Sequence, residues 1–395
     1  MKKMLRITAC LLALLIALCG AGYAREKDTT GLLATINGKD VPIDDALTEY
    51  SYYAMMYGMY GMTNQLETLK QEIAEYYIKL ELIYAKFDEL GLEVSEEFVR
   101  ENADAEYQSA VESYKTYVQK DGKTEEQIRK EAEDLLLQDG YDIGYFEDYA
   151  RNAFRLDAVL KHFTGDISVT EEDVRAYFDD LVASDRELYE SNIAYYEQAS
   201  QYGERIVYTP EGFRRVKHIL VLLSEEDQDK MYDLEKQLAS ETADKAALQA
   251  QIDEIFATIE PKAQEIMDKL TAGEDFISLM ETYGEDPGMT VEPNKTEGYL
   301  VHPQSAQWVT AFRDAAVALE KPGDISQPVR TSYGLHIIRY ESEVPAGPVD
   351  YEAIKDSLRA EVLDTVMNNH YNKIIDEWYA AADITVYLEN FVVAE

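Results

Sequence analysis

Two short apolar segments of this chain each carry a single histidine, and together they could build a small polar site. His218 lies within residues 216–221 and His336 within residues 333–338, where most other side chains are β-branched or leucine. Such runs predict short buried strands. Neutral imidazoles on neighbouring strands can hydrogen-bond to each other and organise a pocket without bringing charge into it. The alternative for either histidine alone is an ordinary place in the core.

The chain between the two histidines contains further segments in a recognisable order. A helical run, three turn-forming segments, an aromatic segment and a Pro-Gly turn follow one another at 262–270, 273–276, 283–288, 297–300, 308–316 and 321–329. This order resembles the parvulin family of peptidyl-prolyl cis-trans isomerases. The resemblance covers about residues 213–341 and rests on six separate blocks in the right order.

The resemblance implies roles for seven residues. His218 and His336 would be the paired pocket histidines, and Asp286 stands where the family has Asp or Cys. The catalytic set that it implies is His218, Asp286, His336 and Thr331, with Thr331 supplying a hydroxyl beside the second histidine. The apolar wall that it implies for the proline ring is Leu300, Trp308 and Phe312.

Two departures from the family pattern bear on the loop and on the pocket. The family usually has Gly-Asp-Leu-Gly where this chain has residues 298–301, and Val301 resists backbone angles that glycine permits. Many members have Met where this chain has Trp308, which could narrow the proline pocket. Because neither departure removes the His/Asp set, we expect an active site with altered preference or rate.

The implied reaction suits such residues. Rotation about an X-Pro bond breaks no covalent bond, but its barrier is roughly 18–20 kcal/mol because amide resonance is lost. An apolar box can grip the proline ring, while polar groups bind the turning carbonyl. The reaction needs no cofactor, and no Gly-x-Ser-x-Gly or catalytic cysteine pattern offers a nucleophile. Metal binding by His218, Asp286 and His336 is an alternative, although His-Glu-x-x-His and cysteine pairs are absent from the sequence.

Residues 1–24 have the pattern of an export signal. Basic residues precede a 12-residue apolar run, which is too short to span a bilayer permanently, and residues 22–24 offer a small-x-small cleavage site. A lipoprotein signal with a lipidated Cys19 is an equally open alternative, as in the PrsA-type surface lipoproteins that the chain resembles. Either alternative predicts an extracytoplasmic protein, freely secreted or anchored to the outer face of the membrane. Cys10 and Cys19 are the only cysteines, so the mature chain has no disulfide.

The charge of the chain constrains its partners. The 395 residues carry a formal net charge of −40 at pH 7. Such a field opposes binding of nucleic acid and anionic lipid, and we expect no nucleic-acid partner. It could attract basic exported clients or cell-wall cations. The alternative is a solvated acidic surface that keeps the protein soluble.

The N-terminal part predicts a helical domain opened by a hairpin. Residues 32–36 predict a strand with a tight turn at Asn37-Gly38, followed by helices near 44–62, 66–90, 94 onwards, 126–137, 144–163 and 170–183. This order resembles the chaperone domain of PrsA- and SurA-type foldases over about residues 30–185. The first helix is rich in Tyr and Met, which suit either a core or a client surface; in the second case Tyr53, Met56 and Tyr57 would be exposed.

The predicted fold class is α+β, a helical chaperone domain with an inserted parvulin domain made of a small antiparallel sheet flanked by helices. We expect a signal peptide at 1–24, the chaperone domain at 25–205, the parvulin domain at 206–345 and a returning helix and strand at 346–395. The last strand could pair with residues 32–36. Residues 224–260 predict a charged insert, either a helical hairpin or an extension of the first helix, and Pro261 could start a new helix.

The sequence therefore predicts an isomerase and chaperone that acts on unfolded or partly folded exported proteins with X-Pro bonds. One alternative is a holdase with a catalytically weak parvulin domain. Another is an extracytoplasmic receptor that uses the same histidines for a metal or peptide.

Overall fold

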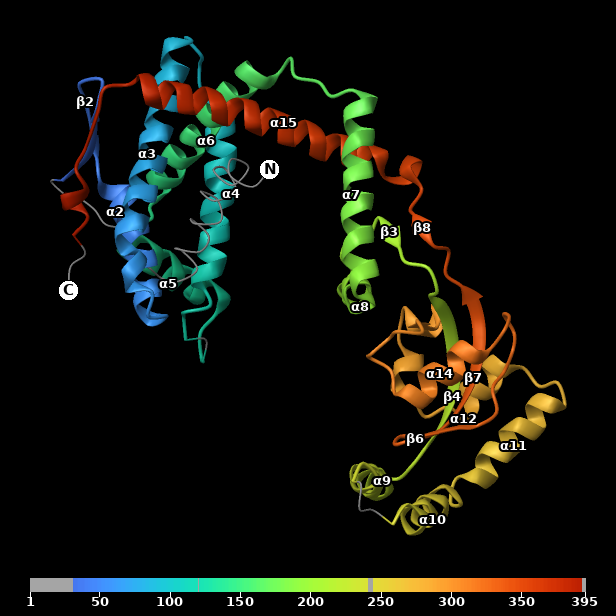
Figure 1. Cartoon of the computed structure of the whole chain (residues 1–395). Helices are drawn as coiled ribbons and strands as arrows, with labels where there is room; N and C mark the ends of the chain where they lie inside the picture. The colour runs from blue at the N-terminus through green and yellow to red at the C-terminus, as the bar shows by residue number, and fades with distance from the viewer. Residues whose placement is uncertain (1–30, 120, 241–243, 393–395) are drawn as a thin grey trace. The chain divides into compact units, whose positions relative to one another are not determined.

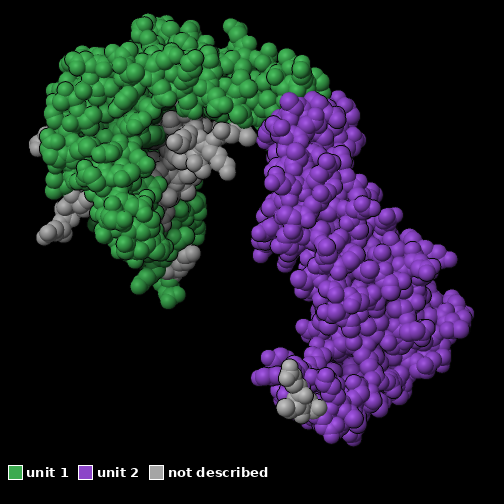
Figure 2. Space-filling view, viewed as in Figure 1, with its two compact units in different colours: residues 1–173, 359–395 green, residues 174–358 purple. Residues whose placement is uncertain are grey.

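The computed structural model describes residues 31–119, 121–240 and 244–392 (Figure 1). The expectations for residues 1–24, including the lipidation of Cys19, lie outside the described residues. The chain divides into two compact units (Figure 2). Unit 1 holds the residues up to Asp173 and from Arg359, and unit 2 holds Val174–Leu358. Residues 174–205 and 346–358, which the sequence analysis placed outside the parvulin domain, lie in unit 2.

A three-stranded antiparallel sheet joins both ends of the chain in unit 1. It consists of β1 (Leu32–Ile36), β2 (Lys39–Pro42) and β9 (Ile384–Val386), in the order β2-β1-β9. Asn37 and Gly38 both have positive φ, 51° and 79°, as a two-residue hairpin turn requires. The predicted turn and the predicted pairing of the last strand with residues 32–36 are both confirmed.

Helices form the rest of unit 1. The sequence motifs set their starts: the side chains of Ser95, Thr124 and Asp142 each accept a backbone N–H of the following helix. The helices of this unit are α2 (Asp44–Met59), α3 (Leu66–Glu89), α4 (Glu96–Tyr114), α5 (Glu125–Gln138), α6 (Ile143–Thr164) and most of α15 (Tyr351–Ala381). Within the described part of the chain, no helix has both the length and the apolar content to cross a membrane.

Helix α2 divides its Tyr and Met residues between two environments. Tyr50 is only 5% exposed, and Tyr53 and Tyr57 pack partly against the same hydrophobic core. Met59, by contrast, is 66% exposed, and Met55 and Tyr60 are exposed beside it. Tyr53, Met56 and Tyr57, which a client surface would expose, are half-buried, and the exposed apolar surface lies around Met55, Met59 and Tyr60.

The centre of unit 2 is a four-stranded antiparallel sheet of order β5-β4-β7-β6. Its strands are β4 (Arg214–Leu222), β5 (Tyr299–Val301), β6 (Val329–Thr331) and β7 (Gly334–Glu343). Helices α7 (Glu171–Ser191) and α8 (Ile193–Tyr202) precede it, and a short ladder of β3 (Tyr208–Thr209) with β8 (Gly347–Pro348) flanks it.

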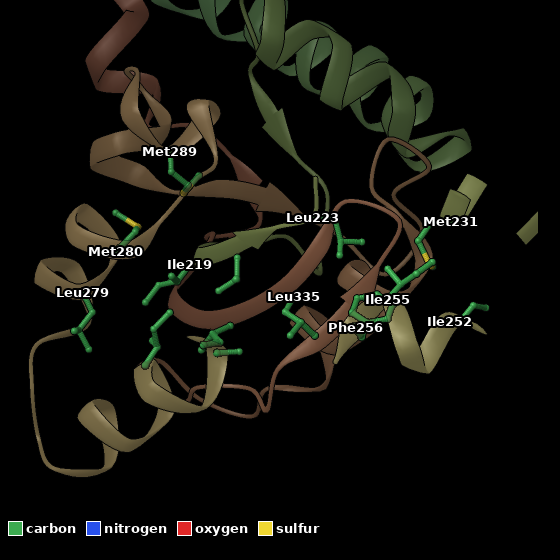
Figure 3. Packing of buried hydrophobic residues seen from close by; sticks show 14 of the residues in the cluster. Ile219, Leu223, Met231, Ile252, Ile255, Phe256, Leu279, Met280, Met289 and Leu335 are labelled. Atoms are coloured by element: carbon green, nitrogen blue, oxygen red, sulfur yellow. The ribbon is translucent and has the colours of Figure 1, made fainter. Parts of the chain in front are cut away.

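Alternation along β4 and β7 gives the sheet two different faces. Ile219 and Val221 of β4 and Leu335 and Ile337 of β7 enter one apolar core, part of which Figure 3 shows. The helices packed on that core are α9 (Glu225–Leu238), α10 (Lys245–Phe256), α11 (Glu260–Thr271) and α12 (Phe276–Tyr283). The insert is thus a helical hairpin, with Pro261 in the first turn of a fresh helix. The opposite face carries the two histidines and α14 (Thr310–Ala318).

Candidate active site

The register of β4 and β7 brings the two sequence-predicted histidines together. His218 pairs with Ile338, and Leu220 pairs with His336. The histidines are therefore diagonal neighbours on one face of the sheet. Their rings stack with centroids 5.0 Å apart, and the two Nδ1 atoms are separated by 3.1 Å. Both side chains are buried, at 3% and 6% exposure.

Asp286 reaches the first histidine from the segment after α12. The backbone N–H of Glu285 donates to the Leu220 carbonyl at 3.0 Å, which holds this segment against β4. The Asp286 carboxylate then accepts three hydrogen bonds. Its Oδ1 accepts from the Gly288 N–H at 2.8 Å, while Oδ2 accepts from His218 Nε2 at 2.6 Å and from the Tyr299 hydroxyl at 2.7 Å.

Thr331 extends the chain of hydrogen bonds on the other side. Its Oγ1 lies 2.7 Å from His336 Nε2 and accepts the Tyr333 N–H at 3.2 Å. A proton on His218 Nε2 faces the carboxylate, so Nδ1 of this ring can accept from a proton on His336 Nδ1. The Thr331 hydroxyl then donates to His336 Nε2. In this arrangement every ring nitrogen of His218 and His336 has a hydrogen-bond partner.

Burial and hydrogen bonding set the charges of this site. Burial and, to a smaller extent, the neighbouring His218 lower the pKa of His336 to about 3 although Asp286 opposes the shift, so this imidazole is neutral at physiological pH. Burial raises the pKa of Asp286, but the hydrogen bonds from His218 and Tyr299 outweigh it and hold the pKa at about 2. The site therefore combines one fixed carboxylate with a neutral imidazole.

Aromatic rings enclose the histidines. The Phe312 ring meets His218 and His336 edge-on, at centroid distances of 5.1 and 5.2 Å. Trp308 lies 5.6 Å from Phe312 and 4.6 Å from Tyr299, and its indole N–H donates to the Leu300 carbonyl at 2.9 Å. Trp308 is thus anchored as part of the wall.

The structure does not bring the Leu300 side chain to this wall. Alternation along β5 points Tyr299 and Val301 to the histidine face, whereas Leu300 packs in a separate cluster with Phe213 and residues of α7 and α8. Tyr299 takes the place that the sequence analysis gave to Leu300. Val301 is a regular, fully buried strand residue paired with Arg214, and the positive φ of the segment, 86°, falls on Gly298.

Sequence analysis missed two features of this unit. It treated Tyr299 only as a departure from the family pattern, although the phenol is a partner of Asp286. It also missed a second buried polar cluster, in which the Ser305 hydroxyl donates to Glu197 of α8 and accepts the His302 N–H at 2.9 Å. No local pattern indicates that cluster, because Glu197 and Ser305 are 108 positions apart.

The arrangement can bind and polarise an amide but offers no group poised to attack one. Asp286 is held as a hydrogen-bonded carboxylate, and Thr331 is held between His336 and the Tyr333 N–H. Across the described ranges, no group of three or more His, Cys, Asp or Glu side chains is arranged to hold a metal ion.

Comparison with known proteins gives a domain assignment for most of the chain. Residues 218–342 match the family described as the PPIC-type PPIASE domain, and residues 2–132 match the SurA-like N-terminal domain. The chain is 22% identical over 383 residues to the foldase protein PrsA of Clostridium botulinum strain Hall, covering 93% of this chain and 91% of that one. It is 38% identical over 112 residues to the foldase protein PrsA 4 of Bacillus cereus, covering 28% and 38%.

Solved structures of such proteins are also similar in part. A SurA-like chaperone of Campylobacter jejuni matches 75% of this chain and 97% of its own, with 20% identity and a TM-score of 0.33. PrsA from Bacillus subtilis matches 90% and 94%, with 18% identity and a TM-score of 0.21.

Proposed function

We propose that this chain, which combines a parvulin-type peptidyl-prolyl isomerase domain with a SurA-like N-terminal domain, is an extracytoplasmic foldase that isomerises X-Pro bonds in exported proteins. The observation that carries the proposal is the hydrogen-bonded chain of Asp286, His218, His336 and Thr331 beneath aromatic rings. Export is supported by the signal-like residues 1–24. The proposal includes anchoring of the protein to the outer face of the membrane through a lipid on Cys19.

The geometry suggests how the barrier is lowered. A planar X-Pro amide owes its stability to resonance that places negative charge on the carbonyl oxygen. The rings of Phe312, Trp308 and Tyr299 form an apolar surface that grips the proline and reduces access of water. The His218 N–H that Asp286 accepts is the donor of this pair that the carbonyl oxygen can share as it turns, because the carboxylate itself only accepts. Interactions that are stronger with the twisted amide than with the planar one raise the rate.

A direct experiment is a protease-free isomerisation assay of the full-length protein on a short X-Pro peptide. We expect catalysed cis-trans exchange, detected by NMR exchange spectroscopy, that the His336→Ala variant loses. A Tyr283→Phe variant is the matched control, because it removes a 2.7 Å hydroxyl-carboxylate bond to Glu265 elsewhere in unit 2. Absence of turnover by the wild-type protein would overturn the enzymatic part of the proposal.

Client binding is proposed for the exposed surface of α2. Met55, Met59 and Tyr60 present adaptable apolar side chains of the kind that promiscuous binding surfaces use. A triple change to Ser should weaken suppression of client aggregation while turnover of a short peptide stays intact. The matched control changes three exposed apolar residues elsewhere in unit 1, Leu135, Leu137 and Ile143, to Ser. Equal weakening by both triple variants would refute a specific client surface at α2.

The second candidate function is a holdase with little isomerase activity. Trp308 favours it, since its large indole is anchored beside the site, at the position where the parvulin pattern that the sequence resembles has the smaller Met. Aggregation suppression without peptide turnover would establish this alternative.

A further inference from the structure

Tyr299 occupies a position that the parvulin resemblance leaves unassigned. It is the first residue of β5 and pairs with Val216 of β4, two residues before His218. Its ring lies 5.5 Å from the His218 ring and 4.6 Å from the Trp308 ring. The ring is therefore held on both sides, and its hydroxyl is aimed at the Asp286 carboxylate.

The Tyr299 hydroxyl and His218 share one oxygen of that carboxylate. Oδ2 accepts from the phenol at 2.7 Å and from His218 Nε2 at 2.6 Å. Burial and the charge of Asp286 both raise the pKa of Tyr299, so the phenol keeps its proton and acts as a donor. With Gly288 N–H on Oδ1, the carboxylate is fixed in rotation by donors on both oxygens.

The backbone around Asp286 leaves just enough room for the phenol. A Cβ added at Gly288 would lie 1.8 Å from the Tyr299 hydroxyl oxygen and 3.0 Å from its ring carbon Cζ. Any larger residue at 288 must displace the hydroxyl from the carboxylate. Gly288 and Tyr299 therefore form a matched pair.

We propose that Tyr299 is a positioning residue of the isomerase site, whose hydroxyl holds the Asp286 carboxylate against His218 and so keeps the His218 proton on Nε2. His218 Nδ1 is then free of a proton and accepts from His336 Nδ1. As a consequence, His336 Nε2 accepts from the Thr331 hydroxyl. The kinetic test of this inference rests on the proposed isomerase function, because it requires measurable turnover. The spectroscopic test does not depend on turnover.

The decisive variant is Tyr299→Phe in the full-length protein, with Tyr283→Phe as the control. Tyr299→Phe keeps the ring contacts with His218 and Trp308 and removes only the donor. We expect kcat/KM for a short X-Pro peptide to fall about three- to tenfold, which corresponds to the net contribution of one typical hydrogen bond. The acid limb of the pH profile should move to higher pH, because Asp286 loses a donor that favours its ionised form. Thermal stability at neutral pH should fall slightly more than in the control, because Asp286 loses one of the donors that depress its pKa.

A second variant tests the same geometry without touching the tyrosine. Gly288→Ala should lower kcat/KM in the wild-type background, because its methyl group displaces the hydroxyl. In the Tyr299→Phe background the same change should cost clearly less, since the contact of 1.8 Å with the hydroxyl oxygen is gone and only the contacts with Cζ and with Asp286 Oδ1, at 3.0 and 3.2 Å, remain. This non-additivity is what a shared mechanism requires. Simple addition of the two losses would count against the proposal.

The spectroscopic arm uses protein labelled with 15N in its five histidines. We expect the His218 ring to carry its proton on Nε2 in the wild-type and control proteins and to show a mixed pattern in Tyr299→Phe. Suppose that the wild-type protein shows no turnover but its His218 ring nitrogens still differ from those of Tyr299→Phe. This result would refute the proposed function and would leave the positioning role of Tyr299 intact. If Tyr299→Phe matched the control in kcat/KM, pH profile and ring nitrogens, the proposal would be overturned.

Discussion

Unit 2 buries two clusters of similar groups in which the pKa of the carboxyl group is shifted in opposite directions. One joins His218 and His336 to Asp286, and the other joins His302 and Ser305 to Glu197. Three hydrogen bonds, one of them from an imidazole, keep Asp286 ionised at a pKa of about 2. Burial instead dominates at Glu197 and raises its pKa, although hydrogen bonds from Ser305 and Gln307 oppose the rise. The donors around a buried carboxyl, and not its burial alone, decide its charge.

The imidazoles differ in the same way. Backbone groups fix His302, whose Nε2 donates to the Glu211 carbonyl and whose Nδ1 accepts the Gln304 N–H, both at 3.0 Å. His218 and His336 are instead linked through side chains and through each other. A backbone-locked imidazole holds a loop in place, whereas a side-chain-linked pair can respond to a bound amide. The contrast separates a structural cluster from a candidate catalytic one.

The strongest test compares His336→Ala with His302→Ala. His336→Ala strands two buried partners, Thr331 and His218, so we expect it to destabilise unit 2 by about 1–3 kcal/mol. His302→Ala should cost less, because the backbone groups that it leaves belong to Glu211 and Gln304, which are exposed to water. Only His336→Ala should also abolish most isomerase turnover under conditions where the variant is folded. Denaturant midpoints and peptide turnover measure the two effects. A matching loss of turnover in His302→Ala would erase the functional difference between the clusters.

Asp286→Asn should show that the ionised carboxylate stabilises the fold as well as the site. The folded pKa is depressed, so this stability is present above the unfolded pKa, near 4, and disappears as the pH falls through about 2. At neutral pH we expect a loss of roughly 1–2 kcal/mol and about a tenfold loss of turnover. Urea titrations at a series of pH values should show that the free energies of unfolding of the variant and the wild type converge as the pH falls. A constant difference at all pH values would contradict the ionised state.

Glu197→Gln should give the smallest effect and the opposite pH trend. Its folded pKa is raised, so the stability from Glu197 is greatest below the unfolded pKa and is lost as pH rises through the folded value. The neutral amide should therefore match the wild type in acid and equal or exceed it, by under about 1 kcal/mol, at pH 7–8. Thermal melts across this range provide the measurement. Destabilisation that grows with pH would show that Glu197 is held as an anion.

Much of this structure could be predicted from local patterns and from family resemblance. The signals for these elements come from residues that are close together in the sequence. The apolar β-branched and leucine runs around His218 and His336 indicated two strands, and the helix expected from residue 94 onwards begins after the cap at Ser95. The spacing in 224–260 fitted both a hairpin and a longer helix, so only packing against the sheet decided between them.

Two parts of the candidate site were beyond such reasoning. Which of Tyr299 and Leu300 faces the histidines depends on the register of β5 against β4, and a shift of one residue exchanges them. The bond between Ser305 and Glu197 depends on where α8 packs, which no local pattern encodes.

The terminal sheet also has a consequence for how the chain folds as it is made from its N-terminus onwards. Strand β1 pairs with β9, and Asn37 Oδ1 accepts the N–H of Asp383, 346 positions later. Contacts of such separation form late, because a long loop must close first. Unit 2 is one continuous segment of the sequence, so it can fold before the residues of β9 are available. Closure of the sheet then marks the arrival of β9, and until that moment one edge of β1 stays open to other extended chains.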